Sequence, residues 1–138
     1  LEFEHVGNTL RALLGYAHVT ISVINFSTEE ITATFLLPEM VSRTGETLDY
    51  FLSLLTGPKR KELALKEPEK YNFKPRELLH NLIHVYLHLS SADRSGAFHA
   101  AIAGDNRSYS VTMFAEAARV LASGQMLSPV EAARLDTL

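Results

Sequence analysis

The sequence predicts an all-α fold of six to seven helices, and three observations support that prediction. Apolar residues recur three or four positions apart through most of the chain, which is the spacing of one helical face. Proline, glycine and serine fall between these periodic segments, where helices begin and end. No partner strand with a turn pattern accompanies the one β-branched run. We therefore expect an irregular stack of antiparallel helix pairs, resembling an α-solenoid.

The first predicted helix covers residues 3–26. Its apolar positions are Val6, Leu10, Leu13, Leu14, Ala17, Ile21 and Ile24. The run from Val19 to Ile24 is also compatible with a strand, but helix is favoured because no partner strand follows nearby. Ser27 and Glu30 have the spacing of a capping box, which predicts that a short second helix begins at Ser27 and ends near Thr34.

The third helix is predicted from Pro38 to Thr56, because proline is well tolerated in the first turn. Its expected apolar face consists of Met40, Val41, Leu48, Phe51, Leu52 and Leu55. Gly57 is expected to end this helix in a left-handed conformation, and Pro58 prevents its continuation. Residues 59–73 are expected to form a connector of mixed charge. Its expected anchors are Leu63, Leu65, Tyr71 and Phe73.

Four further helices are predicted in the second half of the chain. The first begins at Pro75 and ends near residues 90–91. Its expected buried stripe consists of Leu78, Leu79, Leu82, Ile83, Tyr86 and Leu87. A short helix is expected over residues 95–103, and residues 104–109 form a turn. Ser110 is expected to cap a helix over residues 111–123 that Gly124 closes. A capping box of Ser128 and Glu131 predicts the start of the last helix.

Composition excludes several classes of function. The 13 lysines and arginines are fewer than the 16 aspartates and glutamates, which argues against nucleic-acid and anionic-membrane binding. The chain has no cysteine, which excludes disulfides, thiolate metal sites, cysteine nucleophiles and thioester carriers. No apolar run reaches the ~18 residues that span a bilayer. Because the chain begins with Leu1 and its last helix stops without a cap, we expect a soluble intracellular segment of a longer polypeptide.

Three histidines form the sharpest pattern of candidate ligands. His80, His84 and His88 lie four apart and therefore share one edge of the predicted helix. Two histidines at this spacing can bind zinc, but no cysteine and no His-Glu-x-x-His arrangement accompanies them. The alternative, which we favour, is a row of half-buried histidines at the edge of the apolar face.

Two other clusters have both a functional and a structural interpretation. Asp105, Arg107 and Tyr109 are compatible with an acid, an anion clamp and a proton donor. We favour a structural role, in which Arg107 bonds carbonyls at a helix end, Tyr109 is buried, and Asn106 adopts a left-handed conformation. The second cluster is a basic patch with Leu63 and Leu65 interleaved, which suits either an acidic peptide or phosphate, or a solvated loop. Its members are Lys59, Arg60, Lys61 and Lys66.

The residues alone therefore predict no catalytic residue, no cofactor site and no metal site. Six segments nevertheless occur together in an order and spacing that resemble one known family. They are Phe35–Arg43, Leu48–Leu52, Leu55–Arg60, Pro68–Leu79, Ile83–Leu89 and Asp105–Tyr109. They resemble the ubiquitin elongating factor core, which is part of the U-box ubiquitin ligases called E4. The resemblance covers about residues 30–122.

This resemblance implies an armadillo-like α-solenoid and a role in ubiquitin chain elongation. Residues 1–138 would be the C-terminal segment of the core, and the U-box, which binds the ubiquitin-conjugating enzyme, is not present in the chain. The implied partners are ubiquitinated substrates destined for proteasomal degradation, the Cdc48/p97 unfoldase and ubiquitin-receptor shuttles, in the cytoplasm and nucleus. The family-motif residues, for which we expect structural roles, are Pro38, Glu39, Arg43, Gly57, Pro58, Tyr71, Pro75, Tyr86, Asp105, Arg107, Ser108 and Tyr109.

The chain departs from the family pattern at two places. Residues 44–47 replace a hydrophobic-Ala-Ala-Met segment, and Gly45 inside a helix costs about 1 kcal/mol relative to alanine. We therefore expect a thinner core contact and a less straight helix there. Asn106 stands where the family has glycine. Two alternatives remain open, namely a helical-repeat interaction scaffold without a U-box and a zinc enzyme that uses the three histidines.

Overall fold

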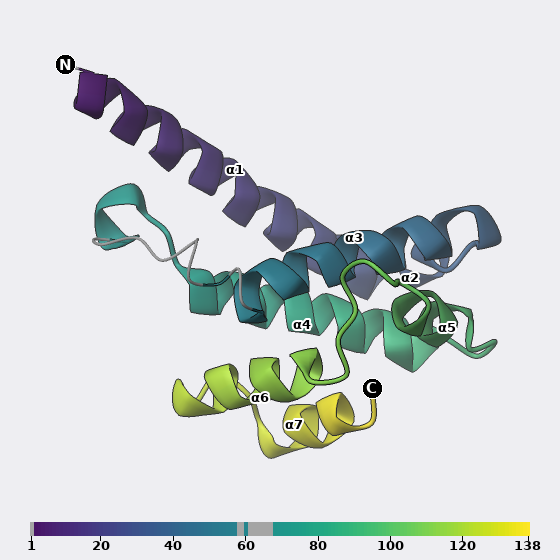
Figure 1. Cartoon of the computed structure of the whole chain (residues 1–138). Coiled ribbons are helices and arrows are strands. Elements are labelled where there is room, and N and C mark those ends of the chain that lie inside the picture. Colours follow the sequence, from purple (N-terminus) through teal and green to yellow (C-terminus); the bar gives the residue numbers. More distant parts are fainter. Residues whose placement is uncertain (1, 58–59, 61–67) are drawn as a thin grey trace.

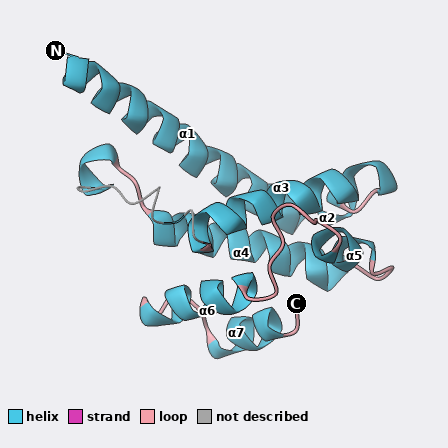
Figure 2. Cartoon of the chain, in the orientation of Figure 1, coloured by secondary structure: helices cyan, strands magenta, loops and turns pink. Residues whose placement is uncertain are grey.

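The computed structural model describes residues 2–57, 60 and 68–138, and within them it is all-helical (Figures 1 and 2). This confirms the predicted all-α class. The elements are α1 (Glu2–Glu30), α2 (Thr32–Phe35), α3 (Pro38–Thr56), the 3₁₀ helix η2 (Pro68–Tyr71), α4 (Pro75–Ala92), α5 (Ala97–Ala103), α6 (Met113–Ser123) and α7 (Pro129–Asp136). No helix in these residues is both long and apolar enough to cross a membrane.

Helix α4 is the centre of the fold and packs against α1, α2, α3, α5, α6 and α7. The predicted stripe is buried, and Val85 and Leu89 are buried as well. Because full burial of such a side chain contributes about 1.5–3 kcal/mol, α4 supplies much of the stability of the core. The N-terminal half of α1 extends away from this centre (Figure 1).

Helix α1 is one unbroken helix, so the alternative of a strand over residues 19–24 is wrong. The predicted capping box at Ser27 is also wrong, because Ser27 lies inside α1 and its carbonyl accepts from the Ile31 N–H at 2.8 Å. The next residue, Thr28, is fully buried, and its Oγ1 lies 3.1 Å from Nδ1 of His88 on α4. Packing against α4 therefore keeps this segment helical in spite of the local capping pattern.

Helix α3 has the predicted bounds, with Pro38 in its first turn. Gly57 follows it in an extended conformation, φ −78° and ψ −170°, so the expected left-handed cap is wrong. A Cβ at Gly57 would lie 2.7 Å from the carbonyl oxygen of Ser53, which accounts for glycine through a close approach. Two predicted face residues, Met40 and Phe51, are more than a third exposed. Pro58, Leu63 and Leu65 lie outside the described residues.

Gly45 lies at a close contact between α3 and α5. A Cβ there would be 3.0 Å from Cβ and 3.2 Å from the carbonyl carbon of Ala101 on α5. The missing side chain therefore lets α5 pack directly on α3 at this position. The helix also runs without interruption through this position.

The starts of α5 and α6 differ from the predictions. Helix α5 begins at Ala97, after Gly96 in the left-handed region at φ 76°. Helix α6 begins at Met113, and Ser110 does not cap it. The Oγ of Ser110 instead accepts from the Thr112 N–H at 3.4 Å, in a local turn that delays the helix.

The end of α6 and the start of α7 are as predicted from the sequence. Gly124 ends α6 as predicted, and Gln125 after it takes the left-handed conformation at φ 55°. The capping box that starts α7 is confirmed. Ser128 Oγ accepts from the Glu131 N–H at 3.2 Å, and Glu131 Oε2 accepts from the Ser128 N–H at 2.8 Å.

Candidate functional site

The three histidines of α4 are half-buried, and two of them contact side chains of other helices. His84 Nε2 lies 2.9 Å from Oε1 of Glu131 on α7, and His88 contacts Thr28 on α1. Burial lowers the pKa of His80 and of His88, so both favour the neutral form. In the described part of the chain, no three acidic or histidine side chains are arranged to hold a metal ion. Their intermediate burial agrees with the interpretation of half-buried histidines at the edge of the apolar face, and the zinc interpretation finds no support in these residues.

The turn at residues 104–109 is organised by Asp105. This carboxylate is 7% exposed, and its Oδ1 accepts from the Arg107 N–H at 3.0 Å. Its own carbonyl accepts from the Tyr109 N–H at 3.1 Å. Tyr109 is only half-buried, although it packs against the core. Asp105 thus holds both ends of the turn, the role that the sequence analysis assigned to Arg107.

Two expectations for this turn are wrong. The Arg107 side chain is 83% exposed and bonds no carbonyl, and its Nη2 lies 3.5 Å from Oε2 of Glu46 on α3. Asn106 does not have a positive φ, since the only non-glycine residues that do so in the described ranges are Asn72 and Gln125. The hydrogen bond that the Arg107 backbone N–H donates to Asp105 shapes the turn without a left-handed residue.

Beneath this turn lies a buried polar pair that the sequence analysis missed. The hydroxyl of Tyr86 on α4 donates to Oδ1 of Asp49 on α3 at 2.7 Å, and both residues are 0% exposed. Asp49 Oδ2 has no hydrogen-bond partner. Burial raises the pKa of Asp49 to about 7 and nearby Asp105 adds to the rise, while the Tyr86 hydrogen bond opposes it. The position of Asp49 between Leu48 and Leu52 on the apolar face was the available clue.

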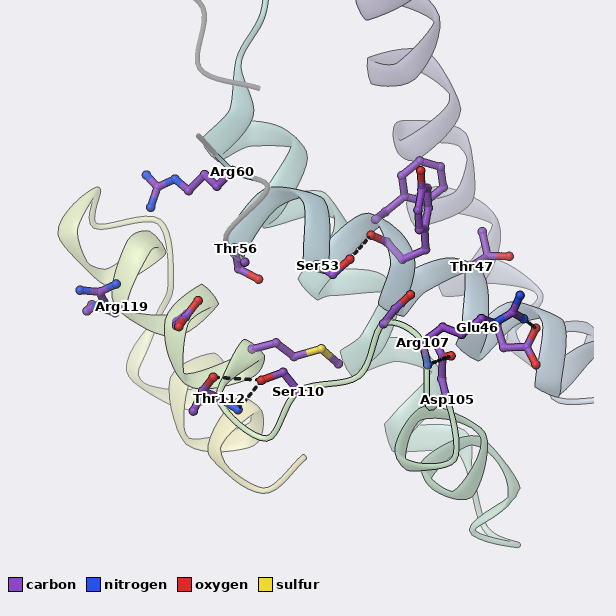
Figure 3. Close-up of a pocket in the computed structure, with 16 residues that line it drawn as sticks. Glu46, Thr47, Ser53, Thr56, Arg60, Asp105, Arg107, Ser110, Thr112 and Arg119 are labelled. Carbon is purple, nitrogen blue, oxygen red and sulfur yellow. Dashed lines mark hydrogen bonds and ion pairs between the residues drawn. The ribbon is translucent and has the colours of Figure 1, made fainter. Parts of the chain in front are cut away.

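A groove of about 1100 Å³ lies between α3, the loop over residues 105–112 and α6 (Figure 3). Glu46 and Arg107 lie at one end, and Arg60 and Arg119 lie at the other. Arg60 is the only member of the predicted basic patch within the described residues. Lys59, Lys61 and Lys66 lie outside them.

The family-motif residues do not gather at one place. Gly57, Asp105, Arg107 and Ser108 line the groove. Tyr86 lies buried in α4, and Tyr71 lies in η2. Pro38, Glu39 and Arg43 lie in the first half of α3, and Pro75 opens α4. Among these residues, Pro38 and Pro75 lie in the first turns of their helices, and Asp105 shapes the turn over residues 104–109.

Comparison with known proteins identifies the family. The profile described as "Ubiquitin elongating factor core" matches residues 1–138. The chain belongs to the ubiquitin elongating factor core family.

Several curated relatives carry names from ubiquitin conjugation. "Probable ubiquitin conjugation factor E4" of Arabidopsis thaliana is 44% identical over 119 residues, which are 86% of this chain and 12% of the relative. "Ubiquitin conjugation factor E4 A" of Mus musculus is 38% identical over 102 residues, 74% of this chain and 10% of the relative. "E4 ubiquitin-protein ligase UFD2" of Saccharomyces cerevisiae is 36% identical over 107 residues, 78% of this chain and 11% of the relative. The chain thus spans about a tenth of the length of these curated relatives.

Proposed function

We propose that this chain is the C-terminal segment of the core of an E4-type U-box ubiquitin ligase and that it acts as a scaffold. The observation that carries the proposal is the match of the whole chain to the ubiquitin elongating factor core family. Relatives named as ubiquitin conjugation factors and as a ubiquitin-protein ligase support a role in ubiquitin chain elongation.

The mechanism that we propose for the parent protein depends on proximity. A U-box outside this chain holds a ubiquitin-charged conjugating enzyme, and the core orients it beside an already ubiquitinated substrate. Holding two reactants together in this way replaces a bimolecular encounter with an effectively unimolecular step. Because the chain has no cysteine, it cannot carry ubiquitin as a thioester, which agrees with a scaffolding role.

The surface of α1 supports an armadillo-like stacking of further helices in the parent protein. Between positions 13 and 27, five large apolar residues of α1 are more than half exposed, and this stretch contains no aspartate, glutamate, lysine or arginine. These residues are Leu13, Tyr16, Val19, Val23 and Phe26. A helix that is apolar on several sides is normally buried on those sides. We therefore propose that a further helical layer of the parent solenoid covers this face of α1.

The wider context of the proposal comes from the family. The partners would be the ubiquitin-conjugating enzyme, ubiquitinated substrates, the Cdc48/p97 unfoldase and ubiquitin-receptor shuttles. The products would be substrates marked for proteasomal degradation, in the cytoplasm and nucleus.

Two measurements test this proposal. The first is the sequence of the parent polypeptide after Leu138, where we expect a U-box. An unrelated domain there would instead favour a helical-repeat scaffold without ligase activity. The second is a purified ubiquitination reaction with activating enzyme, conjugating enzyme, ubiquitin and a mono-ubiquitinated substrate. The parent should extend the chain and the 138-residue segment alone should not. Chain extension by the segment alone would overturn the scaffold assignment.

A further inference from the structure

The groove between α3 and α6 has no role in the function proposed above. It is open to solvent along one side of α3 and is about as large as a site for a short peptide. Its lining contains several hydroxyl groups and exposed aromatic rings, together with charged residues at both ends (Figure 3). These features are the basis for inferring what the groove binds.

The two ends of the groove differ in how their charges are satisfied. At one end, Glu46 lies 3.5 Å from Arg107, and Asp105 accepts a backbone hydrogen bond, so both carboxylates already have partners. At the other end, Figure 3 shows Arg60 and Arg119 beyond Thr56, on the side away from Glu46 and Arg107. Neither arginine forms an ion pair with any carboxylate in the described ranges. This end therefore offers two guanidinium groups to an anion.

One acidic residue reduces the positive charge of this end. Glu116 lines the groove three residues before Arg119 on α6. The balance is then two arginines against one glutamate, which still favours an anionic partner. Removal of Glu116 should increase the affinity for such a partner, so the sign of its effect becomes a test.

The middle of the groove is aromatic. Tyr50 and Phe51 are 49% and 40% exposed, and their rings pack edge to face with centroids 5.7 Å apart. Tyr50 and Thr56 are six residues apart on α3, which corresponds to about 9 Å along the helix axis. An extended peptide covers this distance with about three residues.

We propose that this groove binds an extended segment of a partner protein in which acidic residues follow an apolar residue by about three positions. The apolar side chain packs on Tyr50 and Phe51. The carboxylates bond the guanidinium groups of Arg60 and Arg119, whose planar donors match carboxylate geometry. The charge of this end and the spacing of the aromatic and basic parts select this chemistry over a basic or purely apolar partner.

The first test uses the 138-residue chain and a fluorescein-labelled peptide, Gly-Leu-Ser-Ser-Asp-Asp-Gly. Fluorescence anisotropy should report saturable binding that weakens as salt rises from about 50 mM to about 300 mM. The same peptide with lysine in place of both aspartates, or serine in place of leucine, should bind at least about fivefold more weakly.

Variants of the chain assign the binding to the groove. Arg60→Glu and Arg119→Glu should each weaken binding about threefold to fivefold, and Glu116→Gln should strengthen it about twofold. Arg94→Glu is the matched control, because Arg94 is an exposed arginine in the α4–α5 connection, outside the groove lining. It should leave binding unchanged, and circular dichroism should show the same helix content in all four variants.

Three outcomes would overturn the proposal. The first is the absence of saturable binding up to about 1 mM peptide, because a dissociation constant above that value is too weak for a specific site. The second is equal binding by Arg60→Glu, Arg119→Glu and the wild type. The third is binding by the 138-residue chain but not by the full-length parent, which would mean that the parent's own chain fills the groove. None of these outcomes depends on ubiquitin chain elongation, so failure here is distinct from failure of the proposed function.

Discussion

Replacing Asp49 by asparagine should stabilise the protein at alkaline pH and have little effect at acidic pH. Asp49 is fully buried between α3 and α4, and its pKa is raised from 3.8 to about 7, chiefly by burial. Between these two values the folded protein keeps a proton that the unfolded chain releases. The contribution of Asp49 to the free energy of unfolding therefore falls as pH rises from about 4 to about 7, and it is constant above that range.

The size of the effect follows from the pKa difference. About three pKa units correspond to about 4 kcal/mol, which is the cost of burying the charged carboxylate above pH 7. Asparagine does not ionise, and its side-chain oxygen can still accept from the Tyr86 hydroxyl. Its amide takes the place of Oδ2, an atom that has no partner in the wild type either. We therefore expect Asp49→Asn to gain about 2–4 kcal/mol at about pH 8.5 and less than half as much at about pH 5.

Urea unfolding followed by circular dichroism at both pH values measures this difference. Glu39→Gln is the control, because it removes an exposed carboxylate from the same helix and should leave the pH dependence of stability in place. The reasoning is refuted if Asp49→Asn is less stable than the wild type at about pH 8.5, or if its stability falls with pH as steeply as that of the wild type.

Three further predictions concern packing and capping, and each is measured by urea unfolding. Gly45→Ala should cost about 1–2 kcal/mol because its Cβ would be 3.0 Å from α5, whereas Gly15→Ala should gain about 1 kcal/mol because nothing lies within 4 Å of its Cβ. Equal changes in the free energy of unfolding for Gly45→Ala and Gly15→Ala would contradict the close contact between Gly45 and α5. Asp93→Ala should cost about 1–3 kcal/mol, because this carboxylate accepts from two backbone N–H groups at the start of α5 and from the His99 ring. Burial raises the Asp93 pKa, but the hydrogen bonds that its carboxylate accepts from the His99 ring and from the backbone outweigh burial and lower the pKa. The contribution of Asp93 to stability is therefore present above about pH 4 and is lost at lower pH. Ser128→Ala should cost about 1 kcal/mol through loss of the capping box, and no change would mean that α7 needs no cap.

Local chemistry explains the parts of the fold that the sequence predicted. Pro38 and Pro75 begin their helices where expected, because proline is favoured in the first turn whatever packs around it. Ser128 caps α7 because its partner is only three residues away. Ser27 has the same pattern but lies inside α1, since burial of Thr28 against α4 overrides the local preference.

Contacts between distant residues explain the parts that could not be predicted. The close approach at Gly45 depends on Ala101, and the burial of Asp49 depends on Tyr86, which lies 37 residues away. The groove likewise combines side chains from α3, a loop and α6, which no local pattern connects. In the turn over residues 104–109, the sequence indicated the correct segment but the wrong residue, because Asp105 rather than Arg107 organises it.

The most direct test of the central claim separates scaffolding from binding of the conjugating enzyme in the full-length parent. Leu82→Asp would place a carboxylate at a fully buried site in α4, and Val111→Asp is the control at a residue that is 84% exposed. If this segment is a scaffold that orients a U-box elsewhere in the parent, Leu82→Asp abolishes ubiquitin chain elongation while the conjugating enzyme still binds, and Val111→Asp retains both. Full elongation activity of the Leu82→Asp parent, with its helix content reduced, would contradict the account.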